Sequence, residues 1–145
     1  MRPFKNFDEF IKEGIVKKQS PNKPRAVSLL KESENSYKVL GEFVRKLGLN
    51  DTNANNIIKS AYDIIMELVR AKMLLNGLNS SGQGSHEAEV AYLRELRFSE
   101  TEIYFANQLR YFRNGITYYG RSFDADYAKK VIEFLDKIYK RLQNV

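Results

Sequence analysis

Apolar and polar positions repeat in steps of three and four residues over most of the chain, which is the spacing of a helix with one buried face. The first series lies between Pro24 and Gly48 and consists of Ala26, Leu30, Ser33, Tyr37, Leu40, Val44 and Leu47. Proline is tolerated in the first turn of a helix, and glycine suits the left-handed position that ends one. The pattern predicts a long helix over residues 24–47.

A second series predicts a long helix over residues 53–76. Its apolar positions are Ile57, Ala61, Ile64, Leu68, Ala71 and Leu75, with Asp51, Thr52 and Asn53 as candidate caps at the start and Gly77 at the end. Two long helices joined by a short polar turn are expected to pack antiparallel.

The remaining elements follow from local signals. Residues 76–85, NGLNSSGQGS, contain three glycines and no periodicity, so we expect a mobile hinge or lid. Ser85 is expected to cap a helix over 86–97, Ser99 and Glu102 form a capping-box pattern that starts a helix at residue 100, and Asp124 starts the last helix. An N-terminal helix carries Phe4, Phe7, Ile11 and Ile15 on one side, and we expect it to pack across the bundle or onto another chain. No alternating strand pattern of useful length is found.

These elements predict an all-α fold, an antiparallel up-and-down bundle of about five to six helices. The 145 residues suit one domain, with residues 1–23 as an N-terminal arm and residues 24–142 as the bundle. The absence of cysteine excludes disulfides and thiolate zinc sites. No apolar run approaches the ~20 residues that cross a bilayer, and the start lacks a signal-peptide core, so we expect a cytoplasmic protein without membrane contact.

Charge is unevenly distributed along the chain. The net charge is +6, divided as +5 over residues 1–31, −3 over 32–109 and +4 over 110–145. If the two basic ends fold side by side, they form a positive face for nucleic acid or an acidic partner. The alternative is a solvated surface that keeps the protein soluble.

Several common catalytic sites are excluded by their missing motifs. The chain has no phosphate-binding loop ending in Lys-Ser/Thr, no HExxH and no GxSxG. Asp63 and Glu67 lie four residues apart but without a histidine, so we expect no metal site and no cofactor. His86 is the single histidine, and histidine-dependent chemistry must use it or a partner chain.

The segment LRYFRNGITYYG is the densest aromatic and basic stretch of the chain. It holds Arg110, Arg113, Tyr111, Tyr118 and Tyr119, with Arg121 directly after it. Arginine binds phosphate through its planar fork, and tyrosine rings stack on bases, so these residues are candidate RNA- or nucleotide-binding residues. The alternative is that the tyrosines edge the core and the arginines are ordinary surface charges.

The helix order, the glycine-rich turn before Ser85-His86-Glu87 and the Arg113-Asn114 pair late in the penultimate helix resemble the HEPN superfamily of small helical bundles. Members carry Arg, a polar residue, about three further residues and then His, and this pair acts in metal-independent RNA cleavage across a homodimer. Here Arg113, Asn114 and the spacing match, but Tyr118 stands where histidine belongs. The resemblance makes Arg113, Asn114 and Tyr118 the candidate catalytic residues.

The substitution of tyrosine for histidine bears on the expected activity. A phenol ionises at a much higher pH than an imidazole, so it is a poorer base for a ribose hydroxyl. The resemblance therefore implies a homodimeric RNA- or nucleotide-binding module with a degenerate ribonuclease groove, a metal-independent endoribonuclease only if activity is retained. Other HEPN-like proteins partner small nucleotidyltransferases in toxin and antitoxin pairs, so the alternative is a protein-interaction module. A purely structural helical dimer is a third possibility.

Overall fold

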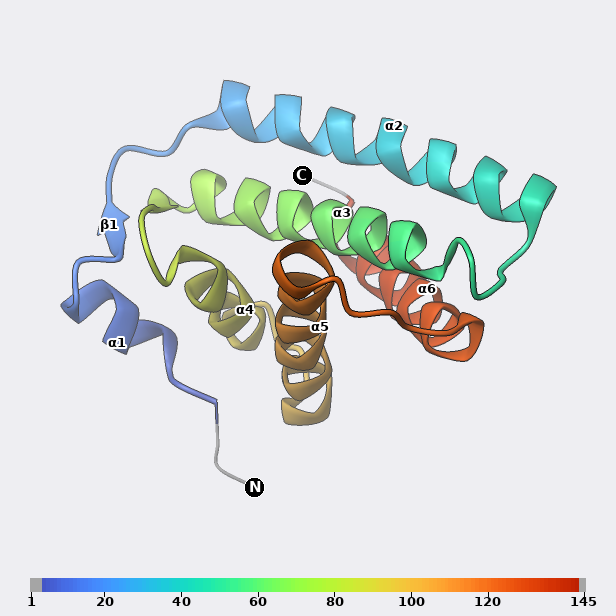
Figure 1. The fold of residues 1–145 in the computed structure, drawn as a ribbon. Helices are drawn as coiled ribbons and strands as arrows, with labels where there is room; N and C mark the ends of the chain where they lie inside the picture. The colour runs from blue at the N-terminus through green and yellow to red at the C-terminus, as the bar shows by residue number, and fades with distance from the viewer. Residues whose placement is uncertain (1–3, 144–145) are drawn as a thin grey trace.

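A computed structural model describes residues 4–143, and over that range the protein is an all-α bundle with one small sheet, as the sequence predicts (Figure 1). In chain order the elements are α1 (Phe7–Lys12), β1 (Val16–Lys18), α2 (Lys23–Leu47), α3 (Ala54–Leu75), β2 (Leu78–Ser80), α4 (Ser85–Glu95), α5 (Glu100–Tyr119) and α6 (Ala125–Leu142). The predicted long helices are confirmed to within one or two residues at each end.

The helices α2 and α3 run side by side in opposite directions, as expected from the short turn between them (Figure 1). The predicted series on α2 is buried at Ala26, Leu30 and Leu40, but Leu47 at its end is exposed. Tyr37 ties α2 to α6, because its ring stacks on that of Tyr139 at 3.8 Å and its hydroxyl donates to Asp136 at 2.6 Å.

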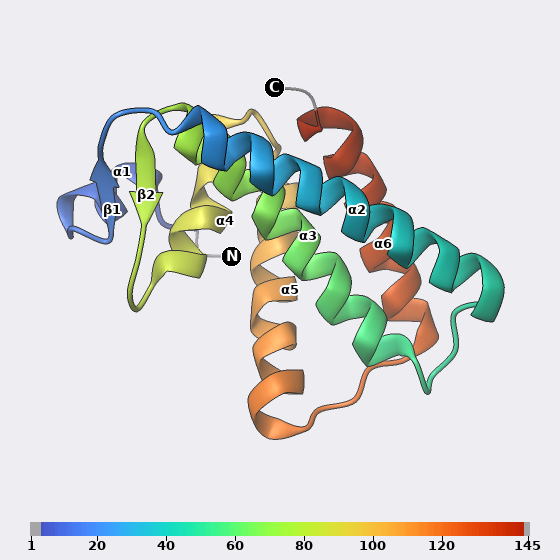
Figure 2. The same ribbon diagram turned by 90° about the horizontal axis from the view of Figure 1, so that it is seen from above.

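The helix α3 is the centre of the bundle. It packs against α2, α6, α4 and α5, so its buried positions extend around most of its circumference (Figure 2). Ile57, Ile64 and Leu68 of the predicted series are buried, and so is Tyr62, which lies outside that series. The helix α5 crosses α3 rather than running along it, and α4 packs against both, so the three helices meet at one junction (Figure 2).

The structure contains a short sheet that the sequence pattern does not indicate, and part of the expected mobile hinge or lid at residues 76–85 lies in it. Residues 78–80 form β2, which pairs antiparallel with β1 in the register Val16 to Ser80 and Lys18 to Leu78. Strands of three residues are too short to show an alternating pattern, so no periodicity indicates them. Gly77 permits the approach, since its φ is +71° and a side chain there would collide with the carbonyl of Gln19.

Helix starts mostly follow the sequence signals. Ser99 and Glu102 form the reciprocal capping box at the start of α5, and the Asp124 side chain caps α6. The expected cap of α4, Ser85, is instead the first residue of the helix. The N-cap position is taken by Gly84, whose φ is +89°, so no side chain caps this helix. The helix α1 packs onto α4, burying Phe7 against the ring of Tyr92 at 4.8 Å.

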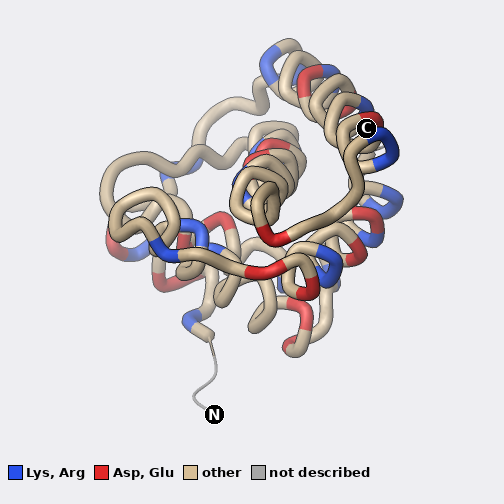
Figure 3. The backbone as a smooth tube through the Cα atoms, turned by 45° about the vertical axis from the view of Figure 1, so that its right-hand side comes forward, with Lys and Arg blue, Asp and Glu red and all other residues tan. Residues whose placement is uncertain are grey.

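The two basic ends of the chain lie only partly side by side. The elements α1 and β1 lie away from α6, whereas α2, which carries Lys23, Arg25 and Lys31, packs beside α6 through the stack of Tyr37 on Tyr139 (Figures 1 and 2). Lys and Arg alternate with Asp and Glu along the helices in the view of Figure 3. Among the described residues, no helix combines the length and the apolarity needed to traverse a bilayer.

Candidate functional site

Two arginines of α5 point toward α3 and α4. Arg110 and Arg113 are three residues apart, which places them on one face of the helix. Both side chains are largely covered, at 18% and 25% exposure. Their ion pairs are long, with Arg110 Nη1 3.9 Å from Glu87 and Arg113 Nη2 3.6 Å from Asp63. The protein's own carboxylates therefore contact these guanidinium groups loosely.

Tyr62 lies beneath Arg113. Its ring is 5.7 Å from Arg113 Cζ, a cation–π distance, and the side chain is 3% exposed. Burial is the main cause that raises the pKa of its hydroxyl, the nearby Glu89 adds to the rise, and Arg110 and Arg113 oppose it. The hydroxyl therefore remains protonated and is available as a donor.

Two buried donors at this junction lack an acceptor. Within residues 4–143, neither Tyr62 Oη nor Arg113 Nε makes a hydrogen bond, and the third buried side-chain atom of this kind, Tyr127 Oη, lies in the aromatic cluster of α5 and α6. A buried polar group without a partner costs about 1–3 kcal/mol. Unpaired donors beside two arginines are the arrangement that an anionic oxygen would satisfy.

His86 reaches the same junction from the first turn of α4. Its ring lies 6.4 Å from that of Tyr62, edge-on, and its Nδ1 is 3.2 Å from Glu89 Oε1. Glu89 is 1% exposed and is held by Arg70, with Nε at 2.7 Å and Nη2 at 3.2 Å from its two oxygens. Burial alone would raise the pKa of the Glu89 carboxyl, but hydrogen bonds from His86 and Arg70 outweigh it and lower that pKa.

We name Tyr62, His86, Arg110 and Arg113 the Tyr62 cluster. The guanidinium of Arg113 lies over the Tyr62 ring, and the imidazole of His86 meets the edge of that ring. Arg110 approaches Glu87, next to His86 on α4, while its Nε donates to Asn107 Oδ1 at 3.1 Å. Glu89, held by Arg70, contacts the imidazole. Fork-shaped cations and neutral donors of this kind bind phosphate oxygens, and an imidazole next to them can exchange a proton or a hydrogen bond with a ligand hydroxyl.

The other residues expected from the sequence lie outside this cluster. Tyr111, Tyr118 and Tyr119 are 62%, 70% and 81% exposed on α5, and Asn114 is half-buried. Arg121 folds back over α5, with its guanidinium against Phe112 and Phe123 and its stem against Gly115, where a side chain would collide with it. Arg110 and Arg113 are therefore brought together, whereas Tyr118 points into solvent.

Sequence reasoning missed Tyr62, Arg70 and Glu89. The spacing of His86 and Glu89, three residues apart in SHEAE, is a signal that the two share a helix face. The contacts of Arg70 with Glu89 and of Tyr62 with Arg113 join separate helices, so no local pattern indicates them.

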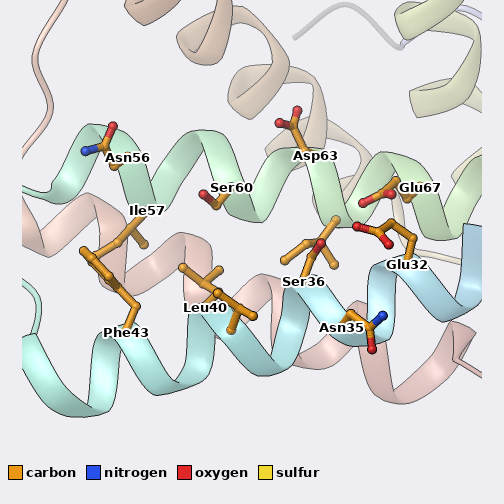
Figure 4. Close-up of a pocket in the computed structure, with 12 residues that line it drawn as sticks. Glu32, Asn35, Ser36, Leu40, Phe43, Asn56, Ile57, Ser60, Asp63 and Glu67 are labelled. Atoms are coloured by element: carbon orange, nitrogen blue, oxygen red, sulfur yellow. The ribbon is translucent and has the colours of Figure 1, made fainter.

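A groove of about 400 Å³ lies between α2 and α3 (Figure 4). We name it the α2–α3 groove. Phe43, Leu40 and Ile57 line its apolar end, and Glu32 and Glu67 lie at the other. Asp63 also borders it, but its side chain points away from α2 (Figure 4). Its carboxylate lies 3.6 Å from Arg113 Nη2. Residues 4–143 contain no group of three or more His, Cys, Asp or Glu side chains placed to hold a metal ion.

Comparison with known proteins gives no relative from which to transfer a function. No protein-family model, no curated protein and no solved structure matches the chain.

Proposed function

We propose that the protein is a HEPN-like module that binds single-stranded RNA, with phosphate held at the Tyr62 cluster. The observation that carries the proposal is the pair of buried donors without an acceptor, Tyr62 Oη and Arg113 Nε, beside two arginines whose carboxylate partners are distant. An RNA phosphate supplies the missing acceptor and the negative charge.

The exposed tyrosines extend this site along α5. Tyr111, Tyr118 and Tyr119 lie on the same helix as the phosphate-binding arginines and present large exposed rings. Unpaired bases stack on such rings, and duplexes do not offer their base faces, so the proposal is for a single strand. A free nucleotide, which has one base and one phosphate group, uses only part of this surface.

The test is fluorescence anisotropy with labelled single-stranded RNA of mixed sequence over a salt series, without added metal. Arg113→Ala is expected to weaken binding about tenfold and to reduce the slope of log affinity against log salt by about one. Arg45→Ala is the matched control, because Arg45 is an exposed arginine at the far end of α2. Equal affinities for the wild type and Arg113→Ala would refute this site.

The same samples report on catalysis. The HEPN-like histidine position is occupied by Tyr118, which is 70% exposed, whereas His86 lies within the Tyr62 cluster. RNA cut without metal by the wild type, and not by Arg113→Ala, would add a metal-independent ribonuclease activity to the binding function. Intact RNA with salt-sensitive binding would indicate a binding module alone.

A second candidate function is docking of a partner protein, such as a nucleotidyltransferase of a toxin–antitoxin pair. The observation that favours it is the same exposed series of Tyr104, Tyr111, Tyr118 and Tyr119 on α5, because tyrosine is enriched at the centres of protein interfaces. Recovery of one stoichiometric protein without RNA, lost in Tyr118→Ala with Tyr119→Ala, would support docking over RNA binding.

We also propose that the module is a homodimer, as the HEPN resemblance implies. A sedimentation mass near twice the 16.9 kDa of one chain at micromolar concentration is expected, and a mass near 16.9 kDa would contradict the dimer.

A further inference from the structure

The imidazole of His86 is held in one orientation although its side chain is 57% exposed. Nδ1 faces the buried oxygen Oε1 of Glu89 at 3.2 Å, and the ring edge meets Tyr62. These two contacts fix the direction of the ring. Nε2, the other ring nitrogen, makes no hydrogen bond with any residue from 4 to 143.

The contacts of Glu89 also determine which ring nitrogen of His86 carries the hydrogen. A carboxylate accepts hydrogen bonds and donates none, so His86 must donate from Nδ1. Glu89 remains a carboxylate because Arg70 binds both of its oxygens and Ser80 Oγ lies 3.4 Å from Oε2. In the neutral imidazole, Nε2 is then an acceptor with a free lone pair.

The outward-facing Nε2 of His86 is a hydrogen-bond acceptor, whereas most of the other groups in the Tyr62 cluster are donors. Arg110 and Arg113 only donate, Tyr62 lacks an acceptor for its own hydrogen, and the carboxylates of Glu87 and Asp63 are occupied by the two arginines, though at long distance. A ligand that satisfies the whole cluster must therefore present anionic oxygens to the donors and one hydroxyl donor to Nε2.

A ribonucleotide unit has both groups. Its phosphate accepts from the arginines, and its 2′-hydroxyl, two bonds from the carbon that bears the 3′ oxygen, can donate to an acceptor beside them. Deoxyribose has no such donor. We propose that His86, positioned by Glu89, selects ribose over deoxyribose in the strand bound at the Tyr62 cluster. This inference rests on the proposed RNA-binding function and adds the group that recognises the sugar.

The test compares three labelled single strands of one sequence under one salt condition: RNA, 2′-O-methyl RNA and DNA. The 2′-O-methyl strand lacks the donor but keeps the sugar conformation of RNA, and the DNA strand lacks the donor without the added bulk of a methyl group. The wild type is expected to bind RNA about five- to tenfold more tightly than 2′-O-methyl RNA, which is the size of one net hydrogen bond.

Substitution assigns the preference to His86. In His86→Ala the affinities for RNA and 2′-O-methyl RNA should become equal, while the affinity for DNA changes less than twofold. The fold tolerates this change because the side chain is exposed, and Gln83→Ala, at an exposed position just before α4, is the control that should keep the preference. A preference for RNA that persists in His86→Ala would overturn the inference.

Glu89→Gln tests whether Glu89 positions the imidazole of His86. Its amide can donate to Nδ1, which turns Nε2 into a donor, so the preference for the 2′-hydroxyl should be lost while Arg113-dependent binding is retained. Retention of the full preference in a folded Glu89→Gln protein would contradict the positioning role. If this variant does not fold, His86→Ala alone decides the inference.

The two proposals fail in different ways. Binding that does not depend on Arg113 overturns both the proposed function and the ribose inference. Binding that depends on Arg113 but is equal for all three strands in the wild type leaves the proposed function intact and overturns the ribose inference alone.

Discussion

The carboxyl groups that lie on the two sides of α3 have pKa values shifted in opposite directions. On the side of the Tyr62 cluster, Glu89 is 1% exposed, is bound by Arg70 and His86, and has a lowered pKa. In the α2–α3 groove, Glu67 is only half-buried, yet burial together with the negative charges of Glu32 and Asp63 raises its pKa. Partners, more than depth of burial, decide which carboxylate is stable as an anion.

This contrast indicates where a polyanion can bind. The α2–α3 groove has unneutralised negative charge and repels phosphate, whereas the Tyr62 cluster has donors without acceptors. Asp63 stands between the two, with its carboxylate 3.6 Å from Arg113.

Removal of the buried carboxylate is expected to have the largest effect on stability. Glu89→Ala leaves Arg70 charged and partly buried without its partner, so the free energy of unfolding should fall by about 3 kcal/mol in urea titrations. Glu95→Ala, an exposed glutamate near the end of α4, should change it by less than about 0.5 kcal/mol. A small effect of Glu89→Ala would show that the pair does not support the cluster.

The hydroxyl of Tyr62 should have opposite effects on stability and on binding. Tyr62→Phe removes a buried donor that has no acceptor, so the free protein should gain about 1 kcal/mol of stability. The same change should weaken RNA binding severalfold, because it removes a donor to phosphate. Tyr127→Phe removes the other unpaired tyrosine hydroxyl and should leave RNA affinity unchanged. Unchanged RNA affinity in Tyr62→Phe would contradict the role of this donor.

A smaller change is expected in the α2–α3 groove. Glu67→Gln removes the repulsion from Glu32 and Asp63 and should stabilise the fold by about 0.5 kcal/mol at neutral pH, as measured by urea unfolding. Glu42→Gln, on the exposed face of α2, should have no measurable effect. Destabilisation by Glu67→Gln would mean that the groove carboxylates are compensated after all.

The contributions of Glu89 and Glu67 to the free energy of unfolding should change with pH in opposite directions. Since the folded-state pKa of Glu89 is lowered, its stabilisation is complete above the unfolded carboxyl pKa and is lost as the pH falls through the folded value. The folded-state pKa of Glu67 is raised, so the charged side chain destabilises the fold fully above this folded-state pKa. The destabilisation vanishes as the pH falls below the unfolded-state pKa. The advantage of Glu67→Gln should therefore disappear in acid, and persistence at low pH would contradict this assignment.

Local patterns in the sequence predict most of the fold. The series from Ala26 to Val44, the capping box at Ser99 and the cap at Asp124 determine helix positions through near neighbours, and each of them is confirmed. The pairing of Val16 with Ser80 depends on two segments far apart in the chain, each too short to show a period. The crossing of α5 over α3 is likewise set by packing between helices.

The candidate site was predictable only in part. The sequence indicates Arg110 and Arg113 through their density of charge and through the family resemblance, and the structure places both at one junction. It does not indicate Tyr62, because a tyrosine outside the apolar series is ordinarily exposed, whereas the central position of α3 buries it. Nor does it show that Arg70 anchors Glu89 and, through it, His86.

The binding of RNA phosphate at the Tyr62 cluster is tested most directly by following the arginine Nε–H groups by ¹H–¹⁵N NMR while single-stranded RNA is added at low salt. Assignments come from Arg113→Lys, Arg110→Lys and Arg45→Lys. The signals of Arg113 and Arg110 are expected to shift together with one affinity, because Arg113 Nε gains the acceptor it lacks, while that of Arg45 stays in place. Binding of RNA with no shift at Arg113 would contradict phosphate binding at the Tyr62 cluster.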